Sequence, residues 1–221
     1  IQLTGETIPL EDARLVAPVL PRSKVVGVGR NYREHAAELG NAVPAEPLLF
    51  FKPNTSVIGP GEPIVLPRQS HNVHHEAELA VVIGRICRDV PPERVPDVVF
   101  GYTCGNDVTA RDLQKRDGQW ARAKGFDSFC PLGPWIETDL DPADLEVTCT
   151  VGIERRQLGR TSEMIHDVAE LVTYISAAFT LLPGDVILTG TPAGVGPIVD
   201  GDDVTVAIEG IGELTNRAVS A

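Results

Sequence analysis

The feature that most constrains this sequence is an apolar run with two carboxylates at its start. Residues 77–83 are apolar at every position except Glu78, and Gly84 follows them. Such a run predicts a buried β-strand. Because side chains alternate along a strand, Glu76 and Glu78 would point to the same face. Two buried like charges repel and lose hydration, so a shared proton, a basic partner or a divalent cation must offset them.

The remaining pattern predicts a fold rich in strands. Further runs of strand length fall at residues 24–29, 48–51, 64–66, 98–107, 135–136, 147–153, 186–189 and 204–208. Residues 168–182 show the apolar spacing of a helix, with a capping box at Asp167 and Glu170 and a stop at Pro183. These elements do not alternate regularly, which excludes a doubly wound α/β fold and favours an α+β, mainly β fold.

The rest of the chain falls into three kinds of segment. Residues 1–21, with several prolines, are expected to form an N-terminal edge segment or hairpin, and residues 22–221 a single domain. Residues 30–40 predict a short polar helix or lid that ends at Gly40. Residues 108–130 are polar and carry most of the cationic side chains, so we expect an irregular stretch there.

Charge and composition exclude several functions. The chain has 221 residues and a net charge of −12, which argues against nucleic-acid binding. No apolar run has the length of a membrane span, and the cysteines lie far apart, so we expect a cytoplasmic protein with reduced thiols. If the substrate is an acid, its site must carry local positive charge against this background.

A third carboxylate extends the opening pair. Asp107 ends another predicted strand and could converge on Glu76 and Glu78. Three oxygen ligands favour Mg²⁺ or Mn²⁺ over zinc. Two alternatives stay open at this point. The carboxylates could pair with Arg or Lys on an exposed face, or nearby histidines could contribute to a different metal site: His71, His74 and His75.

Two further patterns could contribute to chemistry. His35 and Glu38 are three residues apart, so on a helix Glu38 could orient the imidazole as a general base, unless the pair is only a solvated surface turn. The glycine-rich stretch at residues 189–196 lacks the lysine of a P-loop. It is either a tight turn or a loop that brings backbone N–H groups and the Thr191 hydroxyl to an anion.

Several motifs in a fixed order resemble the fumarylacetoacetate hydrolase family, specifically its short, single-domain members that act on acylpyruvates and related keto acids. The motifs are Gly-Arg-Asn-Tyr-x-x-His-x-x-Glu at 29–38, Phe-x-Lys-Pro at 50–53, His-His-Glu-x-Glu-Leu at 74–79, Asn-Asp-x-Thr-Ala-Arg-Asp-x-Gln at 106–114, Lys-Gly-Phe-Asp at 124–127, Pro-Leu-Gly-Pro at 131–134, Thr-Gly-Thr-Pro-x-Gly-Val-Gly at 189–196 and Gly-Ile-Gly-Glu-Leu-x-Asn at 210–216. The resemblance covers the chain from about Lys24 to the C-terminus.

The resemblance implies a mixed β-sandwich or β-roll and a homodimer. It implies Mg²⁺ or Mn²⁺ on Glu76, Glu78 and Asp107. The remaining roles that it implies are an acid/base dyad of His35 and Glu38, a cationic Lys124 at the reacting oxygen, and substrate-site positions at Arg111, Gln114, Thr191 and Lys52.

The implied activity is metal-dependent hydrolysis of a C–C bond in acylpyruvate-like 2-oxo acids, by way of a metal-bound pyruvate enolate. Two alternatives use the same site. Oxaloacetate decarboxylation needs no attacking water, and isomerisation of a 2-hydroxyhepta-2,4-diene-1,7-dioate needs only a proton transfer. A third alternative, from another class, is a non-catalytic protein that binds a metal or keto acid.

Overall fold

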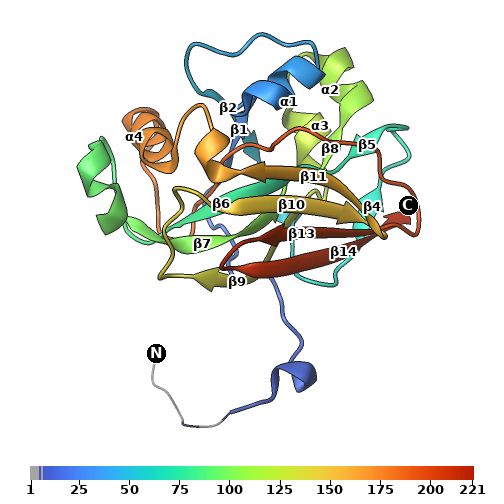
Figure 1. Cartoon of the computed structure of the whole chain (residues 1–221), viewed down its shortest axis with the longest axis horizontal. Helices are drawn as coiled ribbons and strands as arrows, with labels where there is room; N and C mark the ends of the chain where they lie inside the picture. The colour runs from blue at the N-terminus through green and yellow to red at the C-terminus, as the bar shows by residue number, and fades with distance from the viewer. Residues whose placement is uncertain (1–4, 6) are drawn as a thin grey trace.

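The structure is a computed structural model that describes residue 5 and residues 7–221. The strands form two β-sheets and a short ribbon, and the helices gather along the edges of the sheets (Figure 1). The larger sheet has seven strands in the order β2-β1-β12-β6-β7-β9-β3. They are β1 (Val25–Gly29), β2 (Leu48–Lys52), β3 (Val57–Ile58), β6 (Ala77–Ile83), β7 (Val99–Asn106), β9 (Cys130–Glu137) and β12 (Val186–Leu188).

The second sheet has five strands in the order β11-β10-β13-β14-β4, and a two-stranded ribbon pairs β5 with β8. These strands are β4 (Ile64–Leu66), β5 (Val73–His74), β8 (Thr109–Ala110), β10 (Glu146–Val151), β11 (Glu154–Arg160), β13 (Asp203–Ile208) and β14 (Gly212–Ser220). Parallel pairing joins β1 to β12, β3 to β9 and β14 to β4, whereas the other pairs are antiparallel. The predicted α+β, mainly β fold is therefore confirmed.

Helices occupy the connections. They are α1 (Arg33–Glu38), α2 (Arg111–Asp117), α3 (Ala121–Gly125) and α4 (Val168–Ala178), with 3-10 turns η1 (Leu10–Asp12), η2 (Asn54–Ser56), η3 (Pro92–Asp97) and η4 (Thr161–Glu163). The first three helices gather at one end of the sheets, and the chain before β1 runs away from them (Figure 1). Among the described residues, no helix is both long and apolar enough to cross a bilayer.

The strand β6 is buried on both faces, which explains its nearly continuous apolar sequence. Leu79 and Val81 pack in the main core, which also contains side chains of β10 and β13 from the second sheet. Ala80 and Val82 belong to a smaller cluster that also includes Val25 and Val186. Alternation along the strand puts Glu78 on the side of Ala80 and Val82, away from the main core.

The structure differs from the expected elements at several places. The stretch 108–130 contains β8, α2 and α3 rather than irregular chain. The described part of the N-terminal segment, residues 7–21, contains η1 and no strand, while residues 1–4 and 6 lie outside the described residues. The helix α4 has the expected capping box but ends at Ala178, because Phe179 is extended and Leu181 then pairs with Cys87.

The strands β11 and β14 have no counterpart in the sequence prediction. Polar residues dominate β11, which lies at the edge of its sheet. In β14 the buried positions do alternate with exposed ones, but Asn216 occupies one of them and breaks the apolar pattern. Its amide donates to the carbonyl oxygens of Gly59 and Glu62, both at 2.8 Å.

Candidate metal and substrate site

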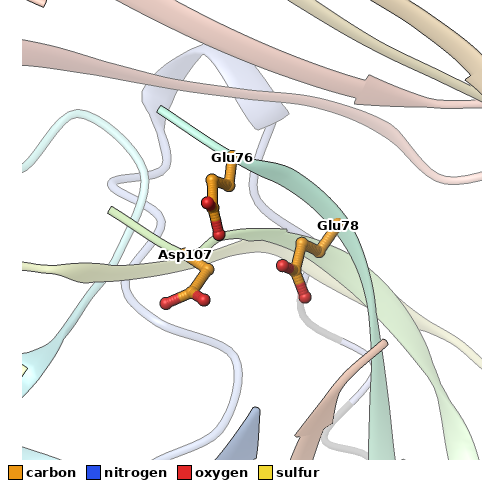
Figure 2. A group of neighbouring side chains, drawn as sticks. All are labelled: Glu76, Glu78 and Asp107. Atoms are coloured by element: carbon orange, nitrogen blue, oxygen red, sulfur yellow. The ribbon is translucent and has the colours of Figure 1, made fainter. Parts of the chain in front are cut away.

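Glu76, Glu78 and Asp107 meet where β6 begins and β7 ends. The two strands pair with Ala77 opposite Asn106, so Glu76 and Asp107 extend the same pair. The amide of Asp107 donates to the carbonyl oxygen of Glu76 at 2.9 Å. One carboxylate oxygen from each acid lies within 4.8 Å of the others, all three residues are buried, and their carboxyl groups gather at one place (Figure 2).

Basic side chains from other elements pair with two of these acids. Lys124 of α3 donates to Glu76 Oε2 at 2.7 Å and also to Asp107. Lys52, at the end of β2, donates to the other oxygen of Asp107, and Arg111, at the start of α2, pairs with Glu76. Burial alone would raise the pKa of Glu76, but Arg111 and Lys124 lower it overall.

Glu78 is compensated differently. The hydrogen bond that the structure gives its side chain comes from the amide of Gly190 at 2.7 Å, and none of its described contacts is an ion pair. Burial and the neighbouring charges of Asp107 and Glu76 raise the pKa of Glu78 well above its ordinary value. Gly190 has a φ of +98°, and a Cβ there would lie 2.7 Å from the Cβ of Asn31, so only glycine can present this amide.

The residues present fit a hard divalent cation. The three donors are carboxylate oxygens, the ligand type that Mg²⁺ and Mn²⁺ prefer, and among the described residues Glu78 has no ion-pair partner to compensate its burial. Of the residues that the structure describes, no group that could hold a metal ion includes the rival histidines His71, His74 and His75. His74 bonds Asn72 at 2.9 Å and His75 bonds Gln157 at 3.0 Å, and neither belongs to the acidic group.

The helix α1 carries His35 and Glu38. Their side chains approach to 3.5 Å between Nδ1 and Oε2, a contact that is not a formed hydrogen bond. The amide of Gly194 donates to both carboxylate oxygens of Glu38 at 3.2 Å. Burial lowers the pKa of His35; the charge of Glu76 opposes this, and those of Arg111 and Lys124 add to it. His35 is therefore neutral near pH 7 and able to accept a proton.

A cavity of about 470 Å³ brings most of the predicted site residues together. Its lining includes His35, Glu76, Glu78, Arg111, Gln114, Lys124 and Thr191. Arg111 also bonds Gln114 at 3.0 Å, and the Thr191 hydroxyl donates to the carbonyl oxygen of Ala77 at 2.8 Å. Glu38, Asp107 and Lys52 are outside this lining. Lys52 contacts Asp107 and the Val108 carbonyl oxygen instead of facing the cavity.

Two buried amides support the site and were missed in the sequence. Gln157 of β11 accepts from the amide of Ala77 at 3.0 Å and donates to Thr191 Oγ1 and the Pro192 carbonyl oxygen, both at 2.8 Å. Asn31 donates to the carbonyl oxygens of His166 and Thr189. Asn31 lies in a motif that the sequence offered, whereas a lone glutamine in a polar strand gives no such signal.

The fold and the site define a known class of protein. The family described as fumarylacetoacetate (FAA) hydrolase C-terminal matches residues 24–219, and the chain belongs to this family. The protein is therefore an enzyme, since relatives in the family are named as hydrolases, isomerases, decarboxylases and tautomerases.

Three similar proteins illustrate the range. The oxaloacetate tautomerase YcgM of Escherichia coli (strain K12) is 46% identical over 206 residues, which cover 90% of this chain and 94% of that protein. A 2-hydroxyhepta-2,4-diene-1,7-dioate isomerase from Mycobacterium marinum has a TM-score of 0.93 and 58% identity, over 99% of this chain and 82% of its own. A fumarylpyruvate hydrolase from Pseudomonas aeruginosa, in complex with Mn²⁺ and pyruvate, has a TM-score of 0.86 and 38% identity, over 91% of each chain. The predicted homodimer and cytoplasmic location stay predictions.

Proposed function

We propose that this enzyme catalyses metal-dependent proton transfer at the carbon next to the keto group of a 2-oxo acid. The enol and keto forms of oxaloacetate, or of a related dioate, would be its substrates. The observation that carries the proposal is the buried imidazole of His35 at one cavity with Glu76 and Glu78, which form a group of three buried carboxylates with Asp107. Relatives named as a tautomerase and an isomerase share 46% and 58% identity with this chain, which supports this reaction as the first candidate.

Glu76, Glu78 and Asp107 would hold the metal. A bound Mg²⁺ or Mn²⁺ would supply a Lewis acid that stabilises negative charge on the oxygens of a 2-oxo acid. Lys124 and Arg111 lie against the same acids and add positive potential at this end of the cavity. This is the local positive charge that an anionic substrate requires in a chain with a net charge of −12.

His35 would move the proton. Its Nδ1 faces Glu38, which leaves Nε2 to act on the substrate. In the keto-to-enol direction, Nε2 removes a proton from C3, the electron pair moves toward the C2 oxygen, and the imidazolium then gives that proton to the oxygen. In the reverse direction the imidazole takes the enol proton, and the imidazolium returns it to C3. A neutral imidazole is the form that begins the first of these steps, which agrees with the lowered pKa of His35.

The hydrolysis of an acylpyruvate is the second candidate, and a relative named fumarylpyruvate hydrolase supports it. In that reaction His35 would take a proton from water that attacks the distal carbonyl, and the C–C bond would break to give a carboxylic acid and a pyruvate enolate. Both candidates need the same metal ligands and the same base, so the substrate decides between them.

A substrate panel tests the proposal. Oxaloacetate tautomerisation, oxaloacetate decarboxylation, acetylpyruvate hydrolysis and isomerisation of a 2-hydroxy-dienedioate are followed with Mg²⁺, with Mn²⁺ and after chelation. We expect metal-dependent tautomerisation or isomerisation to have the highest kcat/KM. Faster hydrolysis of acetylpyruvate would favour the second candidate. Binding of 2-oxo acids without turnover of any substrate would contradict both and leave a binding protein.

A further inference from the structure

The cavity contains two cations that are not used at the acidic end. Arg30, just after β1, and Lys115, on α2, both line it. Neither has an ion-pair or hydrogen-bond partner within the part of the chain that the structure describes, whereas Arg111 and Lys124 are both paired with Glu76. In a chain with a net charge of −12, unpaired cations at a cavity create a local site for an anion.

Arg30 also has an unusual backbone conformation. Its φ of +59° lies in the left-handed region, where a residue other than glycine, asparagine or aspartate is uncommon and strained. The chain nevertheless carries a long cationic side chain here instead of glycine. Strain of this kind is most often retained where a side chain acts on a ligand.

Trp120 fixes the direction of this arginine. The guanidinium carbon of Arg30 lies 6.0 Å from the centroid of the Trp120 ring, within the range of a cation–π contact. The ring packs edge-on against Phe50, and a Cβ on Gly29 would lie 2.6 Å from it, so Trp120 has little freedom to move. Trp120 also lines the cavity, and the arginine is thus held at its wall.

The Trp120 ring also sets an upper limit on the distance between Arg30 and Lys124. Lys124 Nζ, which touches two of the acids, also lies 6.0 Å from the Trp120 centroid. The guanidinium carbon of Arg30 and Lys124 Nζ therefore cannot be further apart than twice this distance. For a 2-oxo acid held at the acidic end, the group that Arg30 would bind is a second anionic group at its far end.

We propose that Arg30, supported by Lys115, binds the distal carboxylate and makes the enzyme selective for 2-oxo dicarboxylates over 2-oxo monocarboxylates. This inference rests on the proposed function for the position of the 2-oxo group. It adds a specificity-determining residue at the wall of the cavity formed by Trp120. The guanidinium is suited to the task because it donates two parallel hydrogen bonds to one carboxylate.

Equilibrium binding tests the inference without turnover. Isothermal titration of the Mg²⁺-loaded protein compares 2-oxoglutarate, with two carboxylates, and pyruvate, with one. Arg30→Asn removes the charge while asparagine tolerates a positive φ, so the melting temperature should not fall. Because this variant loses a hydrogen bond to a charged group, its affinity for 2-oxoglutarate should be about 10- to 100-fold weaker than that of the wild type. Pyruvate affinity should change less than about threefold, because pyruvate has no distal carboxylate.

Two further variants complete the design. Arg30→Lys keeps the charge but loses the planar fork, so its affinity for 2-oxoglutarate should be intermediate. Arg33→Gln removes an equal charge at an exposed position of α1 outside the cavity lining and should leave both affinities unchanged. Equal losses for the two acids in Arg30→Asn, no loss for either, or a wild type that binds both equally would overturn the inference. Failure of the proposed function is a separate result, namely no turnover in the substrate panel while this difference in binding persists.

Discussion

Glu76, Glu78 and Asp107 are at most 3% exposed and extend paired strands, whereas Glu38 has a side chain that is 34% exposed and stands on the six-residue helix α1. The acids are surrounded by Lys52, Lys124 and Arg111 from three other elements. In contrast, the side chains of His35 and Glu38 come no closer than 3.5 Å. The other group that holds Glu38 is the backbone amide of Gly194.

We infer from this difference that the site has a fixed side, formed by the three acids, and an adjustable side, formed by α1. Strand pairing and buried ion pairs set the positions of the carboxylates before any ligand binds. A helix as short as α1 is not stable on its own, so its position depends on its contacts with the rest of the protein. Substitution of the carboxylates should therefore have large effects, both on metal-dependent activity and on the free energy of unfolding. Substitutions on α1 should have smaller effects, mainly on the kinetic constants.

The largest effects are expected from two matched changes on the fixed side, Glu78→Gln and Asp107→Asn. Each removes one metal ligand, so kcat/KM should fall by about 10³-fold or more in both, since a metal contributes several kcal/mol of charge stabilisation. Their effects on metal-free stability should differ. Asp107→Asn leaves Lys52 without a counterion and leaves Lys124 with Glu76 alone, so it should lower the free energy of unfolding by about 3–5 kcal/mol. Glu78→Gln removes an uncompensated carboxylate and should leave that free energy equal or higher.

Denaturant unfolding with chelator, and melting temperatures with and without Mn²⁺, measure these effects. Glu213→Gln, an exposed acid on β14 away from the cavity, is the control and should behave as the wild type. If Mn²⁺ raises the melting temperature of Glu78→Gln as much as that of the wild type, Glu78 is not a ligand. If the free energy of unfolding without metal falls equally in the two variants, the proposed difference between Asp107, which has ion-pair partners, and Glu78, which has none among the described residues, is wrong.

The next largest effect is expected from His35→Ala on the adjustable side. General acid–base catalysis contributes about 10²- to 10⁴-fold, so kcat for tautomerisation should fall by that factor while the affinity for pyruvate changes little. The rate of oxaloacetate decarboxylation should fall less, because that reaction needs no proton removed from C3. His71→Ala, an exposed histidine outside the cavity lining, is the matched control. Equal losses of kcat in the two variants would remove His35 from the mechanism.

The fixed side was also the part that the sequence predicted best. The alternation of Glu76 and Glu78 is a local property, and Asp107 could be added because it ends a neighbouring apolar run. The counterions could not be placed in this way. Lys52, Arg111 and Lys124 reach the acids only because β2, α2 and α3 pack around them, and residues 108–130 showed no periodicity that predicts two helices.

Residues that act through distant contacts were the hardest to predict. Gln157 lies about 80 residues along the chain from Ala77, yet its amide joins β6 to the loop after β12. The residues around Gln157 give no sign of this role, because the sequence of a polar edge strand resembles that of a loop. The strain at Arg30 is likewise a backbone property that the Gly-Arg-Asn-Tyr motif does not reveal.

The smallest effect is expected from Glu38→Gln, and its pH profile is more informative than its size. A contact of 3.5 Å is weak, so the plateau of kcat/KM should fall by about tenfold or less. In the wild type the pKa of His35 is lowered, so activity should persist down to pH 6.5 and decline only below it. The side-chain contact with Glu38 opposes that lowering. Its removal makes His35 a weaker base, which moves the acidic limb to lower pH as the plateau falls.

A merely structural role for Glu38 predicts a different profile. If its function is only to hold the amide of Gly194, Glu38→Gln should change the melting temperature or the KM and leave the acidic limb in place, because the pKa of His35 would not respond. Glu34→Gln, on the first turn of the same helix and outside the cavity lining, controls for a general loss of negative charge on α1. An acidic limb that shifts in Glu38→Gln and not in Glu34→Gln identifies Glu38 as the group that tunes the base. If the acidic limb shifts in neither variant, Glu38 does not change the pKa of His35, and His35 alone carries the catalytic role of α1.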